Sequence, residues 1–232
     1  MRNPLKSFNL RLFLPMSILL CAATEKELAP TIDFLQHTGI DYEVDILITG
    51  VGLSSCTYHL TKQIHVKPPS FIIQGGVAGS LDESLHLGEV VIVEKDQIGD
   101  EGVMEKNEFK SLFQLGLRDD DTFPWQQGKL FNNRADFFQN EGLPLVKGVT
   151  VNEITTDEKR MAYYKHTLNA SIETLEGAAL HYVALMENIP FLQLRSISNY
   201  IGERDKTKWM LSESITNLNM ALRSVLHKVF SV

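Results

Sequence analysis

The sequence predicts an α/β fold, a single three-layer α/β/α domain, and two observations carry the prediction. Short continuous apolar runs alternate along the chain with segments whose apolar residues recur at helical spacing. The runs lack the alternation of half-exposed strands, so we expect a sheet covered by helices on both faces. The chain has 232 residues, 44% hydrophobic and 22% charged, which suits one globular domain.

The first apolar run, residues 17–23, follows a short basic segment and superficially matches a signal peptide. Pro15 interrupts this segment, and the run is too short to span a bilayer. Leu20 stands before Cys21, where a lipoprotein signal needs a small residue. We therefore predict a buried first strand over 17–23. A secreted lipoprotein acylated at Cys21 is the alternative.

Residues 1–15 are then expected to form a flexible extension and residues 16–232 a single domain, because no linker, repeat or low-complexity tract divides them. The first helix is expected over 27–39, with Pro30 in its first turn and Gly39 just past its end. Further helices are predicted over 53–64, 177–188 and 211–229, and strands over 44–50, 70–76, 88–94, 147–153, 170–176 and 190–199.

The stretch 95–147 has no clear period and is rich in aromatic side chains. We expect these to form satellite core and covering loops rather than an aromatic binding site. They are Phe109, Phe113, Phe123, Trp125, Phe131, Phe137 and Phe138.

Composition and missing motifs exclude several functions. The net charge is −7 and no cluster of Lys and Arg appears, which argues against nucleic-acid binding. The two cysteines and seven histidines show no ligand spacing, so no metal and no cofactor are expected, and a reducing, cytoplasmic location is the simpler interpretation. Gly50-Val51-Gly52 follows a strand, but Ser55 stands at the third glycine position of a dinucleotide fingerprint.

Polar and glycine-containing segments follow four of the predicted strands, where open α/β sheets place their ligands. They are Thr24–Glu27, Gly75–Ser80, Glu173–Gly177 and Ser198–Asn199. Each alone has an ordinary structural explanation, such as a carboxylate that favours a helix N-terminus. In this order, however, they match one family.

The chain resembles the nucleoside phosphorylase and nucleosidase superfamily over residues 17 to about 230. Five ordered motifs carry the resemblance, which implies a nucleoside phosphorylase-like central mixed sheet and a purine nucleoside as substrate. The motifs are Ala23-Thr24-Glu25-Lys26-Glu27, Thr49-Gly50-Val51-Gly52, Gly75-Gly76-Val77-Ala78-Gly79-Ser80-Leu81 with Leu87-Gly88-Glu89-Val90-Val91, Glu173-Thr174-Leu175-Glu176-Gly177-Ala178-Ala179, and Arg195-Ser196-Ile197-Ser198-Asn199.

One further stretch, residues 198–205 with Trp209, resembles the futalosine hydrolase family within this superfamily. Those enzymes release hypoxanthine from futalosine in a bacterial route to menaquinone. The alternatives are a methylthioadenosine/S-adenosylhomocysteine nucleosidase, a purine nucleoside phosphorylase, and a non-catalytic nucleoside-binding protein. Members are commonly dimers, so the resemblance also implies a homodimer, with no nucleic-acid or membrane partner.

The resemblance assigns roles that chemistry can check. Glu176 matches the glutamate that binds the ribose hydroxyls and favours a cationic sugar, and Leu175 matches the apolar residue beneath that sugar. Glu27 matches the carboxylate that activates the attacking water. Glu25 and Glu27 repel phosphate, with only Lys26 to offset them, so hydrolysis is favoured over phosphorolysis.

Asn199 stands where adenine-specific relatives carry Asp, which can protonate N7 of the leaving base. An amide cannot act as that acid, but it can donate to a 6-oxo group and accept from a protonated N7. We therefore expect a 6-oxopurine such as hypoxanthine to be the leaving base.

The resemblance places Val77, Ala78 and Gly79, with residues 149–155, around the base. Futalosine also carries a carboxylated aromatic group beyond its ribose. We hypothesise that Arg204 binds this carboxylate, with Lys206 and Lys208 as the other possibilities and a solvated charged loop as the alternative.

Overall fold

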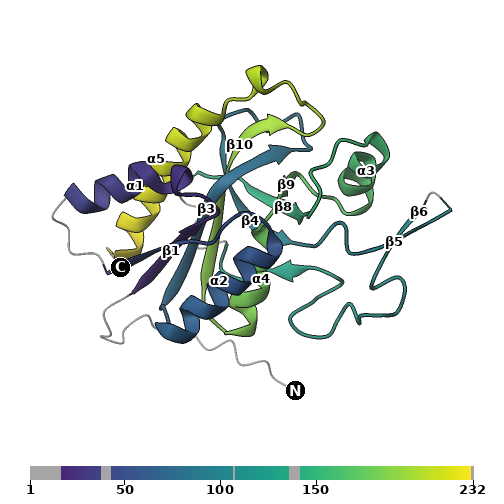
Figure 1. Cartoon of the computed structure of the whole chain (residues 1–232), viewed down its shortest axis with the longest axis horizontal. Helices are drawn as coiled ribbons and strands as arrows, with labels where there is room; N and C mark the ends of the chain where they lie inside the picture. The colour runs from purple at the N-terminus through teal and green to yellow at the C-terminus, as the bar shows by residue number, and fades with distance from the viewer. Residues whose placement is uncertain (1–16, 38–42, 107, 136–141, 231–232) are drawn as a thin grey trace.

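A mixed sheet with helices against both faces forms the centre of the protein (Figure 1). The computed structural model describes residues 17–37, 43–106, 108–135 and 142–230. The sheet has eight strands in the order β10-β4-β8-β9-β3-β1-β2, with β7 paired to β4. They are β1 Ile18–Ala22, β2 Val44–Ile48, β3 Phe71–Ser80, β4 Val90–Asp96, β7 Leu130–Phe131, β8 Leu145–Thr150, β9 Ile172–Thr174 and β10 Phe191–Tyr200.

The strand β3 also pairs with β10, so β3, β10, β4, β8 and β9 form a closed ring of paired strands. The helices that lie against this sheet are α1 Glu25–His37, α2 Leu53–Val66, α4 Gly177–Met186 and α5 Leu211–Phe230, whereas the short helix α3 Glu158–Ala162 lies to one side of it (Figure 1). A π-helical turn over Tyr163–Thr167 extends α3. A separate hairpin, β5 Gly102–Glu105 and β6 Glu108–Ser111, projects from the body (Figure 1).

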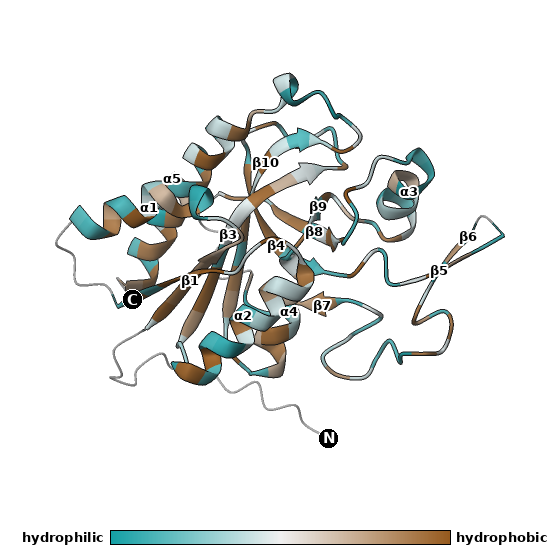
Figure 2. Cartoon of the chain, viewed as in Figure 1, coloured by the Kyte–Doolittle hydropathy of each residue, from teal (hydrophilic) through white to brown (hydrophobic). Residues whose placement is uncertain are grey.

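Two cores separate the three layers. On one face, α1 and α5 bury Leu28 and Leu222 against Ile18 and Ile73. On the other face, α2 and α4 bury residues such as Leu60 against strands β1 and β3. The central strands are hydrophobic along most of their length, as Figure 2 shows, because both faces are covered. The predicted three-layer α/β arrangement with a mixed sheet is therefore confirmed.

The first apolar run is a fully buried inner strand, β1, paired with β2 on one side and β3 on the other. The other predicted strands and helices are confirmed in type and order, within a few residues at their ends. The expected extension over 1–15 and the expected stop at Gly39 lie outside the described residues, as do Phe137 and Phe138. In the irregular stretch, Trp125 packs into a small satellite core with Leu130, as expected.

Two boundaries differ from the prediction. The helix α1 begins at Glu25, so Pro30 lies in its second turn rather than its first. The strand β3 does not end at Gly76 but continues to Ser80, so Gly75–Ser80 is strand and not loop. It continues because β10 supplies hydrogen-bonding partners along its whole length and β9 pairs with its end. The short helix α3 was not predicted.

Asn219 of α5 compensates an interruption in α1. Its Nδ2 donates to the backbone oxygen of Glu27 at 2.9 Å, and its Oδ1 accepts from the backbone N–H of Thr31 at 3.0 Å. These two backbone groups would otherwise bond to each other in a regular helix. The buried amide thus enters the hydrogen-bond ladder beside Pro30, and it ties the first turn of α1 to α5.

No helix among the described residues combines the length and apolar character needed to cross a membrane.

Replacing Asn219 by Leu is expected to lower the free energy of unfolding by about 3 kcal/mol, because buried backbone groups of Glu27 and Thr31 lose their partners. Urea unfolding measures the change. The matched control is Thr216→Ala, an exposed position on the same helix, which should cost about 0.5 kcal/mol or less. Equal stability of the two variants would contradict the structural role of Asn219.

Candidate active site

Glu27 is buried in the first turn of α1, where its carboxylate reaches back to Thr24 just before the helix. Its Oε2 accepts hydrogen bonds from the backbone N–H and the hydroxyl of Thr24, both at 2.9 Å. Its Oε1 accepts one from the backbone N–H of Val77 at 3.2 Å. A carboxylate oxygen accepts about two hydrogen bonds, so Oε2 is saturated and Oε1 retains one acceptor position. Glu25 and Lys26 are exposed.

Glu176 is also buried, and the loop before α2 holds one of its oxygens. The backbone N–H of Gly52 donates to Oε1 of Glu176 at 3.0 Å. Gly52 has φ +96°, a conformation that side chains disfavour. The turn Gly50-Val51-Gly52, which does not match a dinucleotide-binding fingerprint, therefore positions the carboxylate of Glu176.

Arg195 of β10 lies between the two carboxylates and is 1% exposed. Its Nη1 forms an ion pair with Oε2 of Glu176 at 3.6 Å, and its Nη2 donates to Oε1 of Gln74 at 2.7 Å. A side chain at Gly76 would collide with Nη1 of Arg195 and come within 3.2 Å of Oε1 of Glu27. Gly76 therefore leaves the space in which the guanidinium and both glutamates approach one another.

Asn199 lies at the end of β10, half-buried. Its Oδ1 accepts from the hydroxyl of Ser198 at 2.9 Å, and its Nδ2 donates to the backbone oxygen of Tyr200 at 3.0 Å. One N–H and one acceptor position of the amide remain available.

The other expected site residues near the strand ends contribute either backbone groups or apolar side chains. Val77 contacts Glu27 through its backbone, and Leu175 is half-buried in a cluster with Ile201. Ala78 turns its side chain into a core cluster with Ile197, so only its backbone is left for a ligand.

Arg204 is exposed, and its guanidinium lies 5.8 Å from the ring centre of Trp209. Lys208 forms an ion pair with Glu203 at 2.6 Å, and Lys206 is exposed. None of the three lines either of the two cavities described next.

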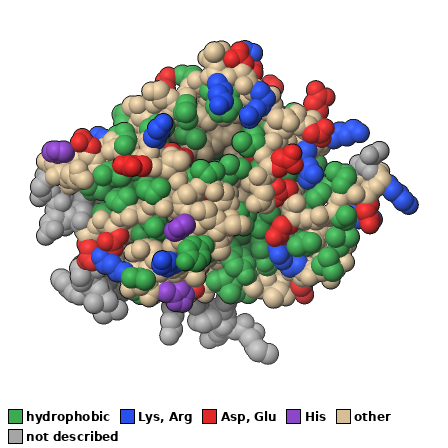
Figure 3. Space-filling view, viewed as in Figure 1, with side chains coloured by type: hydrophobic (Ala, Val, Ile, Leu, Met, Phe, Trp, Pro, Cys, Tyr) green, Lys and Arg blue, Asp and Glu red, His purple; other side chains and the backbone are tan. Residues whose placement is uncertain are grey.

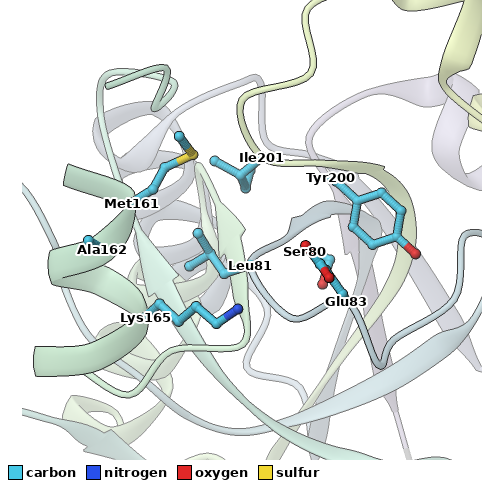
Figure 4. A pocket seen from close by; sticks show the side chains of 8 residues that line it. All are labelled: Ser80, Leu81, Glu83, Met161, Ala162, Lys165, Tyr200 and Ile201. Atoms are coloured by element: carbon cyan, nitrogen blue, oxygen red, sulfur yellow. The ribbon is translucent and has the colours of Figure 1, made fainter. Parts of the chain in front are cut away.

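A cavity of about 540 Å³ opens beside the ends of β3 and β10 (Figure 4). Tyr200 and Ile201 line one side, and Met161 and Lys165, from α3 and the following turn, line the other. A second cavity of about 650 Å³ lies against the hairpin and α3, and Thr155 is among its lining residues. Neither contains Glu27 or Glu176, which lie deeper in the protein.

A buried hydrogen-bond network that includes Thr150 and Asp96 lies beside the turn that carries Glu176. The hydroxyl of Thr150 donates to Oδ1 of Asp96 at 2.9 Å and accepts from the N–H of Ala178 at 2.7 Å. Burial raises the pKa of Asp96 to about 6. Burial lowers the pKa of His181 to about 4, and its Nδ1 lies 3.1 Å from the backbone oxygen of Leu130.

Within the described part of the chain, no three His, Cys, Asp or Glu side chains are grouped so that they could hold a metal ion.

The fold agrees with the comparisons to known proteins. The family model of the phosphorylase superfamily matches residues 23–230, and the chain belongs to that superfamily. A protein of Thermus thermophilus named futalosine hydrolase is 28% identical over 195 residues, 83% of each chain. A 5'-methylthioadenosine/S-adenosylhomocysteine nucleosidase of Staphylococcus aureus is 28% identical over 70% of this chain and 72% of its own.

Among solved structures, the futalosine hydrolase of Helicobacter pylori superposes with a TM-score of 0.77 over 92% of this chain and 98% of its own. The sequence identity is 17%, so the likeness concerns the fold.

Sequence reasoning did not assign roles to Arg195, Gln74, Gly52 and Gly76. Arg195 stands within a motif that carried the resemblance, but its spacing from Glu176 in the chain does not reveal the ion pair. The glycines are visible in the sequence, whereas the atoms that approach them come from distant segments.

The buried pair Asp96 and His181 predicts a particular pH dependence of stability. Asp96 has a raised pKa in the folded state, so its contribution to stability falls as the pH rises from 3.8 to about 6. His181 has a lowered pKa, so its contribution rises with pH from about 4 to 6.5. The two effects oppose each other between pH 4 and pH 6.

Asp96→Asn removes the pH dependence that comes from Asp96 and leaves the one that comes from His181. The rise in the free energy of unfolding between pH 4 and pH 6 should then exceed that of the wild type by about 3 kcal/mol. Urea titrations across this range measure the difference. Parallel profiles for variant and wild type would contradict the assignment.

Proposed function

We propose that this protein hydrolyses the N-glycosidic bond of futalosine, releasing hypoxanthine and dehypoxanthine futalosine. The observation that carries the proposal is the cluster of Glu27, Glu176 and Arg195 beside an amide, Asn199, on β10. The identity of 28% with a Thermus thermophilus protein named futalosine hydrolase, over 83% of each chain, supports it.

Breaking the bond places positive charge on the ribose and negative charge on the purine. Glu176 accepts hydrogen bonds from the ribose hydroxyls, and its negative charge stabilises the cationic sugar. Gly52 and Arg195 fix the orientation of this carboxylate. Leu175 packs beneath the sugar.

Glu27 positions the attacking water through the free acceptor position on Oε1. The water oxygen bonds to C1′ while the C1′–N9 bond breaks, and Glu27 accepts the proton that the water loses. The electron pair of the broken bond passes to the purine, which takes up a proton from solvent, and Glu27 later releases its own proton to solvent. Thr24 and Val77 hold the carboxylate in place.

Water is favoured over phosphate as nucleophile because the buried carboxylates of Glu27 and Glu176 outweigh the one buried cation, Arg195. Of the two acidic residues at the start of α1, only Glu27 is buried, and it repels an anion. The buried cation Arg195 is engaged with Glu176 and Gln74, which leaves it poorly placed to bind phosphate.

The second candidate function is hydrolysis of methylthioadenosine or S-adenosylhomocysteine, which the Staphylococcus aureus relative favours. Asn199 argues against it, because its amide cannot protonate N7 of adenine. The same amide suits the O6 and protonated N7 of hypoxanthine.

We also propose that the protein works in the cytoplasm as a homodimer. Exposed apolar side chains gather on α2 and α4 (Figure 3), among them Tyr58 at 60% and Met186 at 50% exposed. A patch of this kind is typical of a protein interface. Sedimentation velocity of the full chain tests the dimer, and a monomer at micromolar concentration argues against it.

The base released by the purified protein tests the proposed reaction. Futalosine, inosine and methylthioadenosine are incubated separately, and the products are identified by chromatography. We expect hypoxanthine from futalosine, with the other two substrates processed far more slowly. Adenine released from methylthioadenosine at a higher rate would favour the second candidate, and no release from any substrate would indicate a binding protein.

Asn199→Asp is expected to shift the base preference toward adenine nucleosides by about tenfold or more, because the carboxyl group can protonate N7. The ratio of kcat/KM for futalosine to that for methylthioadenosine measures the shift. An unchanged ratio in a folded variant excludes this role for Asn199.

A further inference from the structure

Glu173 shares a row of the sheet with Asn199. In the strand register, Asn199 of β10 lies opposite Gly79 of β3, and Gly79 lies opposite Glu173 of β9. Directly opposed residues of neighbouring strands turn their side chains to the same face of a sheet. The register between β10 and β3 shifts just before Asn199, but Nδ2 of Asn199 lies 3.4 Å from the point where a Cβ of Gly79 would stand, so Asn199 and Glu173 flank Gly79 on one face.

The carboxylate of Glu173 is buried, and one of its oxygens is without a partner. Glu173 is 5% exposed, and its Oε1 accepts a hydrogen bond from the backbone N–H of Thr155 at 3.1 Å. Its Oε2 has no hydrogen-bond partner among the described residues. Burial raises the pKa of Glu173, and hydrogen bonding from Thr155 partly opposes this. A buried acceptor left open in this way is costly unless a ligand completes it.

We propose that Oε2 of Glu173 accepts a hydrogen bond from N1–H of the purine, so that Glu173 and Asn199 bind the two edges of a 6-oxopurine that meet at O6, with the base lying over Gly79. This inference deepens the proposed function and rests on it. A 6-oxopurine carries a hydrogen on N1, whereas adenine presents a lone pair there. An ionised carboxylate can only accept, and it therefore selects the first and rejects the second.

The spacing of the strands fits a purine. Neighbouring strands lie about 4.8 Å apart, which places Asn199 and Glu173 about 10 Å apart across Gly79. This interval separates the two backbone positions and leaves room over Gly79 for a base that forms hydrogen bonds of about 2.9 Å through N1–H on one side and through O6 and N7 on the other. Gly79 places no side chain on this face, where a Cβ would lie 3.4 Å from Nδ2 of Asn199 and would collide with Ile201.

Ile201 covers Gly79 in this structure, and its side chain also borders the cavity of about 540 Å³ (Figure 4). The cavity gives Ile201 room to turn aside when a base enters.

Glu173 discriminates between hypoxanthine and adenine more strictly than Asn199 does. A rotated amide can exchange its donor and acceptor and so adapt to the other base, whereas a carboxylate cannot become a donor without taking up a proton. Together the two residues identify O6, N7 and N1–H, which are the groups that separate hypoxanthine from adenine.

Glu173→Gln tests the proposal, because the structure dictates how the new amide must lie. The N–H of Thr155 retains the amide oxygen, which leaves the NH₂ group where Oε2 stood. This donor opposes N1–H of hypoxanthine and matches N1 of adenine. The ratio of the Kd values for hypoxanthine and adenine, measured by calorimetry, should shift toward adenine by about 100-fold. Glu158→Gln, an exposed position in the first turn of α3, is the matched control and should leave the ratio unchanged.

A second measurement uses the unaltered protein. 1-Methylhypoxanthine lacks the N1–H group, so the wild type should bind it at least about tenfold more weakly than hypoxanthine. Equal binding of these two bases, or an unchanged preference in a folded Glu173→Gln protein, overturns the proposal. If the proposal fails in this way while the wild type still releases hypoxanthine from futalosine, the proposed function stands. If the wild type does not turn over futalosine, but its base preference depends on Glu173, the proposed function fails and the proposal about Glu173 stands.

Discussion

The ion pair between Arg195 and Glu176, 3.6 Å apart and almost fully buried, is the interaction on which the rest of the site depends. Breaking a buried pair by removing one partner leaves an uncompensated charge, which is strongly destabilising. Gln74 accepts a hydrogen bond from Nη2 of Arg195, Gly52 donates one to Glu176, and Gly76 leaves the space that the guanidinium occupies. Glu27 reaches the same space from α1. Arg195 thereby compensates the charge of Glu176, while hydrogen bonds from Thr24 and Val77 hold the buried carboxylate of Glu27.

The fold provides this arrangement because β3 and β10 run side by side for nearly their whole length. Arg195 lies opposite Gly76, and Asn199 lies opposite Gly79, so β10 presents the guanidinium and the amide to glycines on its neighbour. The first turn of α1 is fixed independently, since Asn219 bonds to the backbone of Glu27 and Thr31. The carboxylates and the amide are thus held by elements far apart in the chain.

The layers and the order of elements could be predicted because buried strands appear as continuous apolar runs, as in residues 18–22. Glu27, Glu176 and Asn199 could be chosen because they follow such runs, and they match a family pattern. The extension of β3 through its glycines could not be predicted, since it depends on pairing with β10. The chemistry of Glu173 was equally hidden, because a free carboxylate oxygen shows only in three dimensions. The hypothesis that Arg204 binds the substrate carboxylate stays a prediction, and its guanidinium lies beside Trp209.

The source of the oxygen added to the sugar tests most directly whether this site uses water. Futalosine is turned over in water enriched in heavy oxygen with inorganic phosphate present, and the sugar product is analysed by mass spectrometry. Since Arg195 is engaged by Glu176 and Gln74 and Glu27 repels anions, we expect the heavy oxygen in the sugar product and no phosphorylated sugar. A phosphorylated product, or a rate that requires phosphate, would contradict the account.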